Sequence, residues 1–395
     1  MVPNDWEKYP VGEICTSIVP GRNKPKAFEG HIPWVTTPEI KGRYIPSKFQ
    51  KNYISEQSRR ECGGKLVPKG AVVMSAVGEL GLVAIAQEEV VLNQQLHAFV
   101  CSSKINNEFL AYWLGSQKPY MASIASKTTI PYLNKTNCES IPVAVPPLPE
   151  QQKIANILST WDKAISTTER LIDNSTQQKK ALMQQLLTGR KRLFDEWGKR
   201  FEGEWIKTDL RKLLKEEGAR NKGDKIQRVL SVTNHSGFVL PEEHFSKRVA
   251  SKDTSNYKIV RKGQFGYNPS RINVGSFARL DEYEDGVLSP MYVIFSVLPK
   301  KLNSDYFYQW MHSHEAKQRI NNSTQGSVRD SVNFSSLEAI SLSIPNLEEQ
   351  QKIAAVLTNA DQEIEILEQQ LTDLQQEKKA LMQQLLTGKK RVRVE

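Results

Sequence analysis

The sequence predicts an α+β protein in which two globular mixed α/β halves are joined by two long antiparallel coiled-coil helices, giving the chain a pseudo-twofold internal repeat. Two repeated phrases lead to this prediction. EQQKIA occurs at residues 150–155 and again at 349–354, and KKALMQQLLTG occurs at 179–189 and again at 378–388. Both pairs are 199 residues apart. The equal offset means that the two copies have the same length.

The repeated segments, residues 148–189 and 347–388, share 23 of 42 positions, and their apolar residues follow a heptad pattern. In the second copy these positions alternate in steps of four and three with only Lys378 polar: Ile353, Leu357, Ala360, Ile364, Leu367, Leu371, Leu374, Leu381 and Leu385. The first copy keeps the spacing but places Thr168, Ser175 and Lys179 on the same stripe. Two equal copies in one chain favour an intramolecular antiparallel pair, with a homomeric coiled coil as the alternative.

Both predicted helices have recognisable ends. Pro149 suits the first turn of the first helix, and Asn346 followed by Glu349 predicts an N-cap for the second. Gly189 and Gly388 stand where a left-handed residue ends a helix. At about 1.5 Å per residue, each helix should span on the order of 55–60 Å.

The segments outside the helices predict small sheets packed with short helices. Runs such as KGAVVMSAVGELGLVAIA and GVLSPMYVIFSV read as strands, and NNEFLAYWLGSQKPYMASI and SDYFYQWMHSHEAKQRI read as amphipathic helices. The helical spacing of Tyr112, Trp113, Tyr306, Phe307 and Trp310 favours core packing over base stacking. The predicted boundaries are 1–147 for the first half, 148–189 for the first helix, 190–346 for the second half, 347–388 for the second helix and 389–395 for a basic tail.

Composition limits the class of protein. The chain has 395 residues, a net charge of +10 and four scattered cysteines without a CxxC pair. These cysteines favour a reduced cytosolic compartment, so we expect a cytoplasmic protein. No apolar run approaches the roughly 20 residues of a membrane helix, and the start lacks the layout of a signal peptide, so we expect no membrane partner.

The sequence offers no convincing catalytic centre. It contains neither a GxxxxGKS/T loop nor a GxGxxG motif after a strand. YNPS at residues 267–270 partly matches the Asn-Pro-Pro-aromatic motif of amino-methyltransferases, but it lacks the second proline and the aromatic residue, so a turn is favoured. His312 and His314 would point to different helix faces, which makes a poor metal pair. We assign Glu349 and Lys352 to an intrahelical ion pair.

Nucleic-acid binding agrees better with the charge pattern. Residues 1–147 contain 16 Lys and Arg against 12 Asp and Glu, and residues 193–346 contain 23 against 19, so each half carries +4. Loops rich in Lys, Arg, Asn, Gln, Ser and Thr could contact phosphates and base edges, although solvated basic loops are the alternative. The candidate DNA-binding residues are Arg22, Lys24, Lys26, Lys41, Arg43, Lys127, Thr128, Arg220, Lys222, Lys225, Asn268, Arg271, Asn273, Gln325 and Arg329.

Taken with the repeat, two stretches resemble a known family. IPVAVPPLPEQQKIANIL and ISLSIPNLEEQQKIAAVL each lead into a long helix that closes with KKALMQQLLTG, which resembles the specificity subunit of type I restriction-modification systems over essentially the whole chain. The resemblance implies two target-recognition domains, each reading one half of a split double-stranded DNA site, and a helical spacer. The unlike sequences of the two halves predict an asymmetric target.

The same resemblance implies a subunit without catalytic activity or cofactor. It would recruit modification subunits that methylate adenine with S-adenosylmethionine and restriction subunits that translocate and cut DNA, so ATP and Mg²⁺ are also expected only on the partners. Two other functions stay open from the residues themselves. One is a coiled-coil scaffold without direct DNA contact, and the other is a DNA methyltransferase or nuclease in its own right.

Overall fold

The computed structural model describes residues 3–21, 23–126, 129–234, 236–241, 253–324 and 331–393. The chain is mixed α and β, as predicted, and its contacts divide it into two units. The first unit comprises Met1–Glu169 with Gln369–Glu395, and the second comprises Arg170–Glu368. Each unit therefore contains one globular half and part of both long helices.

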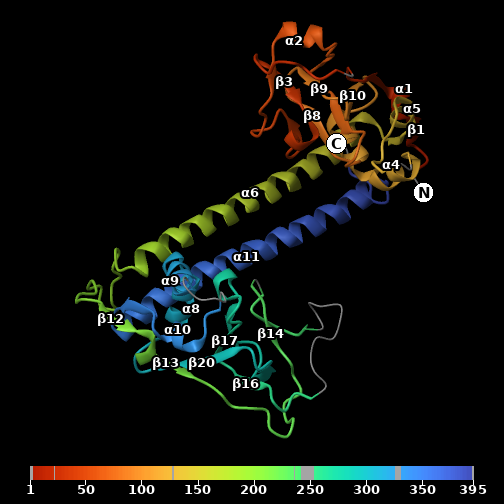
Figure 1. Ribbon diagram of the computed structural model, residues 1–395. Coiled ribbons are helices and arrows are strands. Elements are labelled where there is room, and N and C mark those ends of the chain that lie inside the picture. Colours follow the sequence, from red (N-terminus) through yellow and green to blue (C-terminus); the bar gives the residue numbers. More distant parts are fainter. Residues whose placement is uncertain are drawn as a thin grey trace. The chain divides into compact units, whose positions relative to one another are not determined.

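The long helices are α6 (Leu148–Leu186) and α11 (Leu347–Leu385), each of 39 residues. Within each unit they lie side by side (Figure 1). In the first unit the start of α6 shares a core with Leu385, the last residue of α11, and with Leu386, which follows it. In the second unit the start of α11 shares a core with Leu186 and Leu187. The predicted antiparallel pairing is therefore present in both units.

Two polar positions on the predicted seam have partners on the opposite helix. The ammonium group of Lys378 pairs with the carboxylate of Asp162, and that of Lys179 pairs with Asp361. The two pairs are related by the repeat, because Asp361 and Lys378 lie 199 residues after Asp162 and Lys179. Polar groups at a coiled-coil seam fix the register of its helices. The same register is therefore specified once in each unit.

The globular half of the first unit contains two larger sheets. The five-stranded sheet has the order β2-β10-β7-β8-β4 and the four-stranded sheet the order β5-β3-β9-β6. Its strands are β1 (Glu7–Pro10), β2 (Cys15–Ile18), β3 (Ile32–Val35), β4 (Tyr44–Ile45), β5 (Tyr53–Ile54), β6 (Leu66–Val67), β7 (Val72–Ser75), β8 (Val83–Ala86), β9 (Val90–Leu92), β10 (Leu96–Cys101) and β11 (Pro142–Val145). Its helices are α1 (Val11–Ile14), η1 (Thr37–Glu39), α2 (Glu56–Glu61), α3 (Asn107–Ser116), α4 (Lys118–Ile124) and α5 (Lys135–Glu139).

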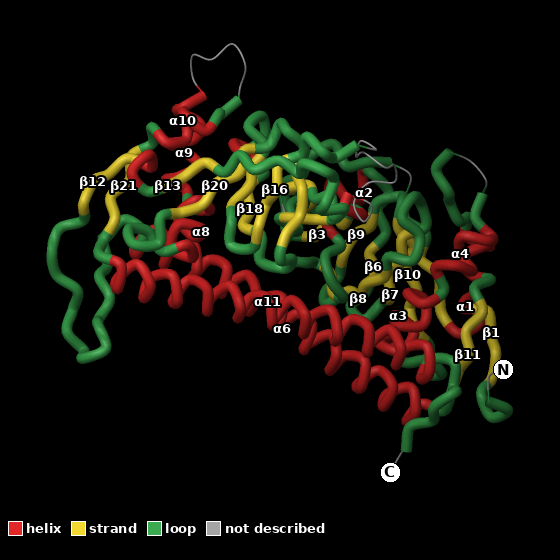
Figure 2. Tube along the Cα trace, turned by 90° about the horizontal axis from the view of Figure 1, so that it is seen from below, coloured by secondary structure: helices red, strands yellow, loops and turns green. Residues whose placement is uncertain are grey.

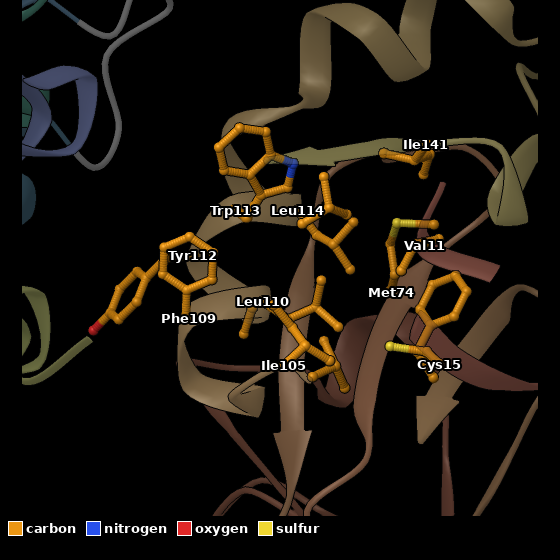
Figure 3. Packing of buried hydrophobic residues seen from close by; sticks show 14 of the residues in the cluster. Val11, Cys15, Met74, Ile105, Phe109, Leu110, Tyr112, Trp113, Leu114 and Ile141 are labelled. Carbon is orange, nitrogen blue, oxygen red and sulfur yellow. The ribbon is translucent and has the colours of Figure 1, made fainter. Parts of the chain in front are cut away.

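The core of this half forms where α3 covers the five-stranded sheet. Figure 3 shows Leu110 and Leu114 of α3 on the side of Met74 of β7, and Phe109 belongs to the same cluster. Tyr112 and Trp113 are 3% and 8% exposed, so their predicted role in the core is confirmed. Burying a large apolar side chain contributes about 1.5–3 kcal/mol, and α3 supplies several to this one cluster. Because the same cluster includes residues at the start of α6, α3 packs the sheet against that helix.

The second unit is built in the same way around a four-stranded sheet of order β13-β20-β17-β18. Its strands are β12 (Ile206–Asp209), β13 (Leu214–Glu216), β14 (Ser231–Val232), β15 (Phe238–Val239), β16 (Lys258–Arg261), β17 (Phe265–Tyr267), β18 (Phe277–Arg279), β19 (Asp285–Leu288), β20 (Val293–Val297) and β21 (Ser341–Ile344). Its short helices are η2 (Leu210–Lys212), η3 (Ile272–Val274), α8 (Ser304–His312), α9 (His314–Thr324) and α10 (Phe334–Glu338). Tyr306, Phe307 and Trp310 are at most 1% exposed, which confirms them as core.

A short antiparallel strand pair precedes each long helix. β1 pairs with β11 in the first unit and β12 with β21 in the second (Figure 2). The register repeats at the 199-residue offset, since Glu7 faces Val145 and Ile206 faces Ile344. The repeat therefore includes the strands that join each globular half to its helix. Among the described residues, no helix is both long and apolar enough to cross a membrane.

Acid should destabilise the first unit through His97. This side chain is 3% exposed on β10, its Nε2 lies 3.1 Å from Ser17 Oγ, and burial lowers its pKa to about 4. The unfolded chain, with a histidine pKa near 6.5, takes up the proton first, so stability falls as pH drops through that interval. Between pH 7 and pH 5 we expect His97 alone to remove roughly 2 kcal/mol.

Hydrogen exchange of β10 amides at pH 7 and pH 5, corrected for the intrinsic exchange rate, measures this loss. His97→Gln should lack that part of the pH dependence, whereas His314→Gln, at an exposed histidine of the second unit, should retain it. Equal pH dependence in wild type and His97→Gln would contradict the prediction.

Candidate nucleic-acid interface

The phrase EQQKIA anchors each long helix to its globular half through a buried glutamine. Gln151 Oε1 accepts a hydrogen bond from Asn106 N at 2.7 Å, and Gln350 Oε1 accepts one from Asn303 N at 2.8 Å. The glutamine Nε2 atoms donate to Pro146 O and Pro345 O, at 2.8 and 2.9 Å. Both glutamines are at most 1% exposed. The repeated phrase thus fixes how each half sits on its own helix.

The glutamate of the same phrase pairs with an arginine that follows the other helix. Glu349 accepts two hydrogen bonds from Arg192, from Nε at 2.6 Å and Nη2 at 2.7 Å. In the first unit, Glu150 accepts from Arg391 at 2.8 and 2.9 Å, and Asp5 binds the same guanidinium. The predicted intrahelical pair of Glu349 with Lys352 is therefore wrong. A fully buried carboxylate needs a partner that reaches into the core, which a neighbour on the exposed helix face does not.

The predicted helix ends are confirmed. Asn346 Oδ1 accepts from Glu349 N at 2.9 Å, and Pro149 lies in the first turn of α6. Gly189 and Gly388 have φ values of 70° and 69°, the left-handed conformation that favours glycine. A Cβ at Gly388 would also lie 2.4 Å from Pro3, so the start of the chain packs against the end of α11 within the first unit.

One predicted DNA-binding loop of the second unit, residues 220–225, is held by its buried asparagine. Asn221 Nδ2 donates to Ile226 O at 2.9 Å and to Thr254 Oγ1 at 3.2 Å, and its Oδ1 accepts from Ile226 N at 3.0 Å. These bonds leave Lys222 and Lys225 exposed. Arg220 is also exposed and donates to Asn256 O at 2.7 Å. The loop therefore presents three cations from a fixed backbone.

A second loop in this unit contains Asn268, Arg271 and Asn273. Asn268 Oδ1 accepts from Ser270 N at 3.0 Å, and its carbonyl accepts from Arg271 N at 2.9 Å, which confirms the predicted turn at Asn268. Arg271 and Asn273 are exposed. Val332 N donates to Pro269 O at 2.9 Å, so the chain beyond α9 returns to this loop. Gln325 and Arg329, which precede Val332, lie outside the described residues.

The first unit distributes its candidates less evenly. Lys24, Lys26 and Lys41 are exposed on loops, whereas Arg22, Lys127 and Thr128 lie outside the described residues. Arg43 is tied down: its Nε donates to Glu108 Oε2 and its Nη2 to Glu108 O, both at 2.7 Å. The guanidinium also lies 3.4 Å from the centre of the Tyr112 ring. A phosphate would have to compete with these contacts for Arg43.

Sequence reasoning missed the residues that connect α3 and α8 of the globular halves to the long helices. Tyr112 Oη donates to Asp162 at 2.5 Å, and Gln309 Nε2 donates to Asp361 at 2.7 Å, so each seam carboxylate also holds the globular half of its own unit. Burial and the Asp162 carboxylate both raise the pKa of Tyr112. The signal available was that Asp162 and Asp361 are identical at the repeat offset. Within the described part of the chain, no cluster of three His, Cys, Asp or Glu residues could hold a metal.

Comparison with known proteins supports a DNA-directed role. The family profile described as the type I restriction modification DNA specificity domain matches residues 3–174 and 245–376. The MjaVIII specificity subunit of a type I restriction enzyme from Methanocaldococcus jannaschii is 26% identical over 417 residues, covering 99% of this chain and 94% of the relative. The EcoR124I/EcoR124II specificity subunit of Escherichia coli is 26% identical over 159 residues, covering 38% and 39%.

Solved structures show the same fold. The S subunit of a type I restriction-modification system from M. genitalium aligns with a TM-score of 0.61 at 15% identity, covering 98% of this chain and 97% of the other. A chain from a study of complex assembly and conformational transition of the type I R-M system aligns with a TM-score of 0.58 at 16% identity, covering 98% of both chains. Two globular halves with two long helices are thus an architecture found in such subunits.

Proposed function

The chain belongs to the type I restriction modification DNA specificity family, and from this membership we propose that its two globular halves read the two parts of an asymmetric, bipartite DNA site. It is a specificity subunit of a type I restriction-modification system. Such a subunit is non-catalytic, so methyl transfer and cleavage belong to other subunits. This placement argues against the two alternatives, a scaffold that never meets DNA and an enzyme complete in itself.

The observation that carries the proposal is the contrast between a repeated frame and unlike loops. The strand pairs, buried glutamines, seam ion pairs and arginine–glutamate pairs recur at one offset of 199 residues. The loops around Lys24 and Lys222 share the tripeptide RNK at an offset of 198 residues, but outside it the loops that carry Lys24, Lys41, Lys222 and Arg271 differ in sequence. A constant frame holding two different surfaces fits a protein that reads two different half-sites.

The partners we propose are double-stranded DNA, modification subunits with methyltransferase activity and restriction subunits with helicase and nuclease activity. S-adenosylmethionine, ATP and Mg²⁺ would bind to those subunits rather than to this chain. The DNA would be contacted by Lys24, Lys26, Lys41, Arg220, Lys222, Lys225, Asn268, Arg271 and Asn273, together with Arg22, Lys127, Thr128, Gln325 and Arg329. Arg43 is left out because Glu108 and Tyr112 engage its guanidinium. These partners place its action in the cytoplasm.

DNA binding by the assembled subunits tests this function. For a duplex that carries the recognition site, the logarithm of the binding constant should fall linearly with the logarithm of the salt concentration, because each neutralised phosphate releases counterions. Affinity for an unrelated duplex of equal length should be at least about a thousand-fold weaker. Methyl transfer by this chain without its partner subunits, or equal affinity for both duplexes, would contradict the proposal.

Arg271→Ala should relax the specificity of one half-site. Arg271 is exposed, and an arginine that bonds both acceptors of a guanine contributes about 1–3 kcal/mol of discrimination. Binding to duplexes with single base changes measures the effect: one position of one half-site should lose its preference. Arg211→Ala is the control, because Arg211 is exposed but pairs with Glu338 at 2.9 Å. If Arg271→Ala weakens binding equally on every duplex, Arg271 contacts a phosphate and not a base.

A further inference from the structure

A cavity of about 440 Å³ opens in the globular half of the first unit, with aromatic and amide groups on its walls. Trp34, which is 8% exposed, and Phe28, which is 37% exposed, supply the aromatic surface, and their ring centres are 5.2 Å apart. Lys24 Nζ lies 5.7 Å from the centre of the Phe28 ring. The volume falls in the range of small-molecule sites. The two ring planes are tilted by 56°, so each ring offers its own face, and an aromatic face with one cation beside it favours a planar group attached to an anion.

The walls of the cavity are fixed by a buried carboxylate. Glu39 is 6% exposed, and its Oε2 accepts from Thr36 N at 2.9 Å and Thr36 Oγ1 at 2.8 Å. Its Oε1 accepts from Lys51 N at 3.0 Å and from Asn52 Nδ2 at 3.1 Å. Thr36 and Asn52 both line the cavity. Glu39 therefore joins two wall segments, and the cavity is formed before any ligand arrives.

Several amides of the cavity retain hydrogen-bonding capacity. Gln95 Oε1 accepts from Asn93 Nδ2 at 3.2 Å and from Thr37 Oγ1 at 3.3 Å, which leaves Gln95 Nε2 available as a donor. Within the described part of the chain, the side chains of Asn23 and Gln94 make no hydrogen bond with other residues. Donors and acceptors thus stand beside an aromatic face. An apolar ligand would leave these amides unpaired, which is costly once water is excluded.

We propose that this cavity takes a single nucleobase turned out of the base stack of the bound DNA. The base would stack on the exposed face of Phe28 with Trp34 at the wall beside it, its edge would bond the amides of Gln94 and Gln95, and Lys24 would face its phosphate. Asparagine and glutamine amides match the donor and acceptor pattern of base edges, and a base that leaves the stack is read by such edge contacts and by aromatic faces. The inference rests on the proposed DNA-binding function and adds to it a site for one extruded base in the first half-site.

A mismatch walk through the first half-site tests the proposal with the full chain and its partner subunits. Each base pair in turn is replaced by a mismatch, and the affinity is measured at fixed salt. Extrusion is easier when the base is unpaired, so one position should bind roughly ten-fold more tightly than the matched duplex. Phe28→Ala should remove this gain and weaken binding of the matched site roughly ten-fold, as loss of one stacked base does.

Phe49→Ala is the matched control, because Phe49 is a 50% exposed aromatic residue of the same unit with Lys48 Nζ 5.1 Å from its ring centre. It should leave both affinities unchanged. Gln94→Ala, at an exposed side chain without internal hydrogen bonds, should lower the gain without affecting folding. The mismatch walk also distinguishes failure of this proposal from failure of the proposed function. If the protein binds the site specifically but no mismatch raises its affinity, the extruded-base proposal is overturned and the DNA-binding function stands.

Two further outcomes are decisive. An equal loss for Phe28→Ala and Phe49→Ala would overturn the cavity as a site. A free nucleoside could supply the same base chemistry as an extruded base, so the protein is also titrated with adenosine, cytidine, guanosine and thymidine. If a nucleoside binds saturably, Phe28→Ala abolishes that binding and no mismatch raises DNA affinity, the cavity is a free-nucleoside site and the proposal is overturned. Absence of specific DNA binding by wild-type protein would overturn the proposed function, and this inference with it.

Discussion

Arg192→Met is expected to lower the free energy of unfolding of the second unit by about 3 kcal/mol. The substitution removes the partner of Glu349, whose side chain is fully buried and receives two hydrogen bonds from this guanidinium. A buried carboxylate without a partner carries its whole desolvation penalty. Chemical denaturation followed by hydrogen exchange at the first turns of α11 measures the loss in this unit.

The repeat offers an internal control. Arg391→Met removes the equivalent contact to Glu150, but Arg391 is 44% exposed and Glu150 keeps a hydrogen bond from Trp6 Nε1 at 3.3 Å, so the loss should be smaller. Combining Arg192→Met with Glu349→Leu should recover much of the stability, because replacing both members of a buried pair by apolar groups is often nearly neutral. A double variant no more stable than Arg192→Met would show that the loss comes from packing rather than from an unpaired charge.

These pairs also mark the limit of prediction from the sequence. The repeat, the helix ends and the heptad pattern are local or periodic, and each predicted its structural element correctly. The sequence pairs Glu349 with Lys352, because only a neighbour three residues away is visible from the helical spacing. Arg192, which is 157 residues distant, becomes its partner only when α6 and α11 pack antiparallel. A long-range ion pair forms only in the tertiary fold, whereas a heptad pattern can be read directly from the sequence.

The roles of the candidate DNA-binding residues likewise depend on contacts that form only in the folded chain. Residue type alone placed Arg43 and Lys41 in one basic loop, but folding separates their roles. Arg43 turns inward to Glu108 and Tyr112, while Lys41 remains exposed. The cavity at Trp34 was not predicted because its walls come from β3 and from four separate loops, which contacts of Glu39, Phe28 and the paired strand β3 bring together in the folded chain. Apart from the RNK tripeptide at 22–24 and 220–222, these loops have no repeat in the second half by which the sequence could identify them.

Deleting one heptad from each long helix should change the gap that the protein accepts between half-sites. Removing residues 167–173 and 366–372 takes two seam positions out of each helix and keeps the alternation of four and three. Both seam ion pairs, Lys378 with Asp162 and Lys179 with Asp361, lie outside the deleted segments. Seven residues correspond to about 10 Å of helix, which is close to 3 base pairs of B-DNA. Binding to duplexes with gaps varied one base pair at a time measures the preferred gap.

We expect the best gap to shorten by about 3 base pairs, with a weaker maximum, because 3 base pairs also turn the duplex by roughly 100°. A variant that replaces the same two heptads by other helix-forming residues, keeping the seam and the length, should retain the wild-type gap. The two variants therefore distinguish an effect of helix length from an effect of the side chains on the helix surface. If the shortened protein folds, binds each half-site alone as before and still prefers the original gap, the helices do not measure the distance, and the spacing must be set by the partner subunits.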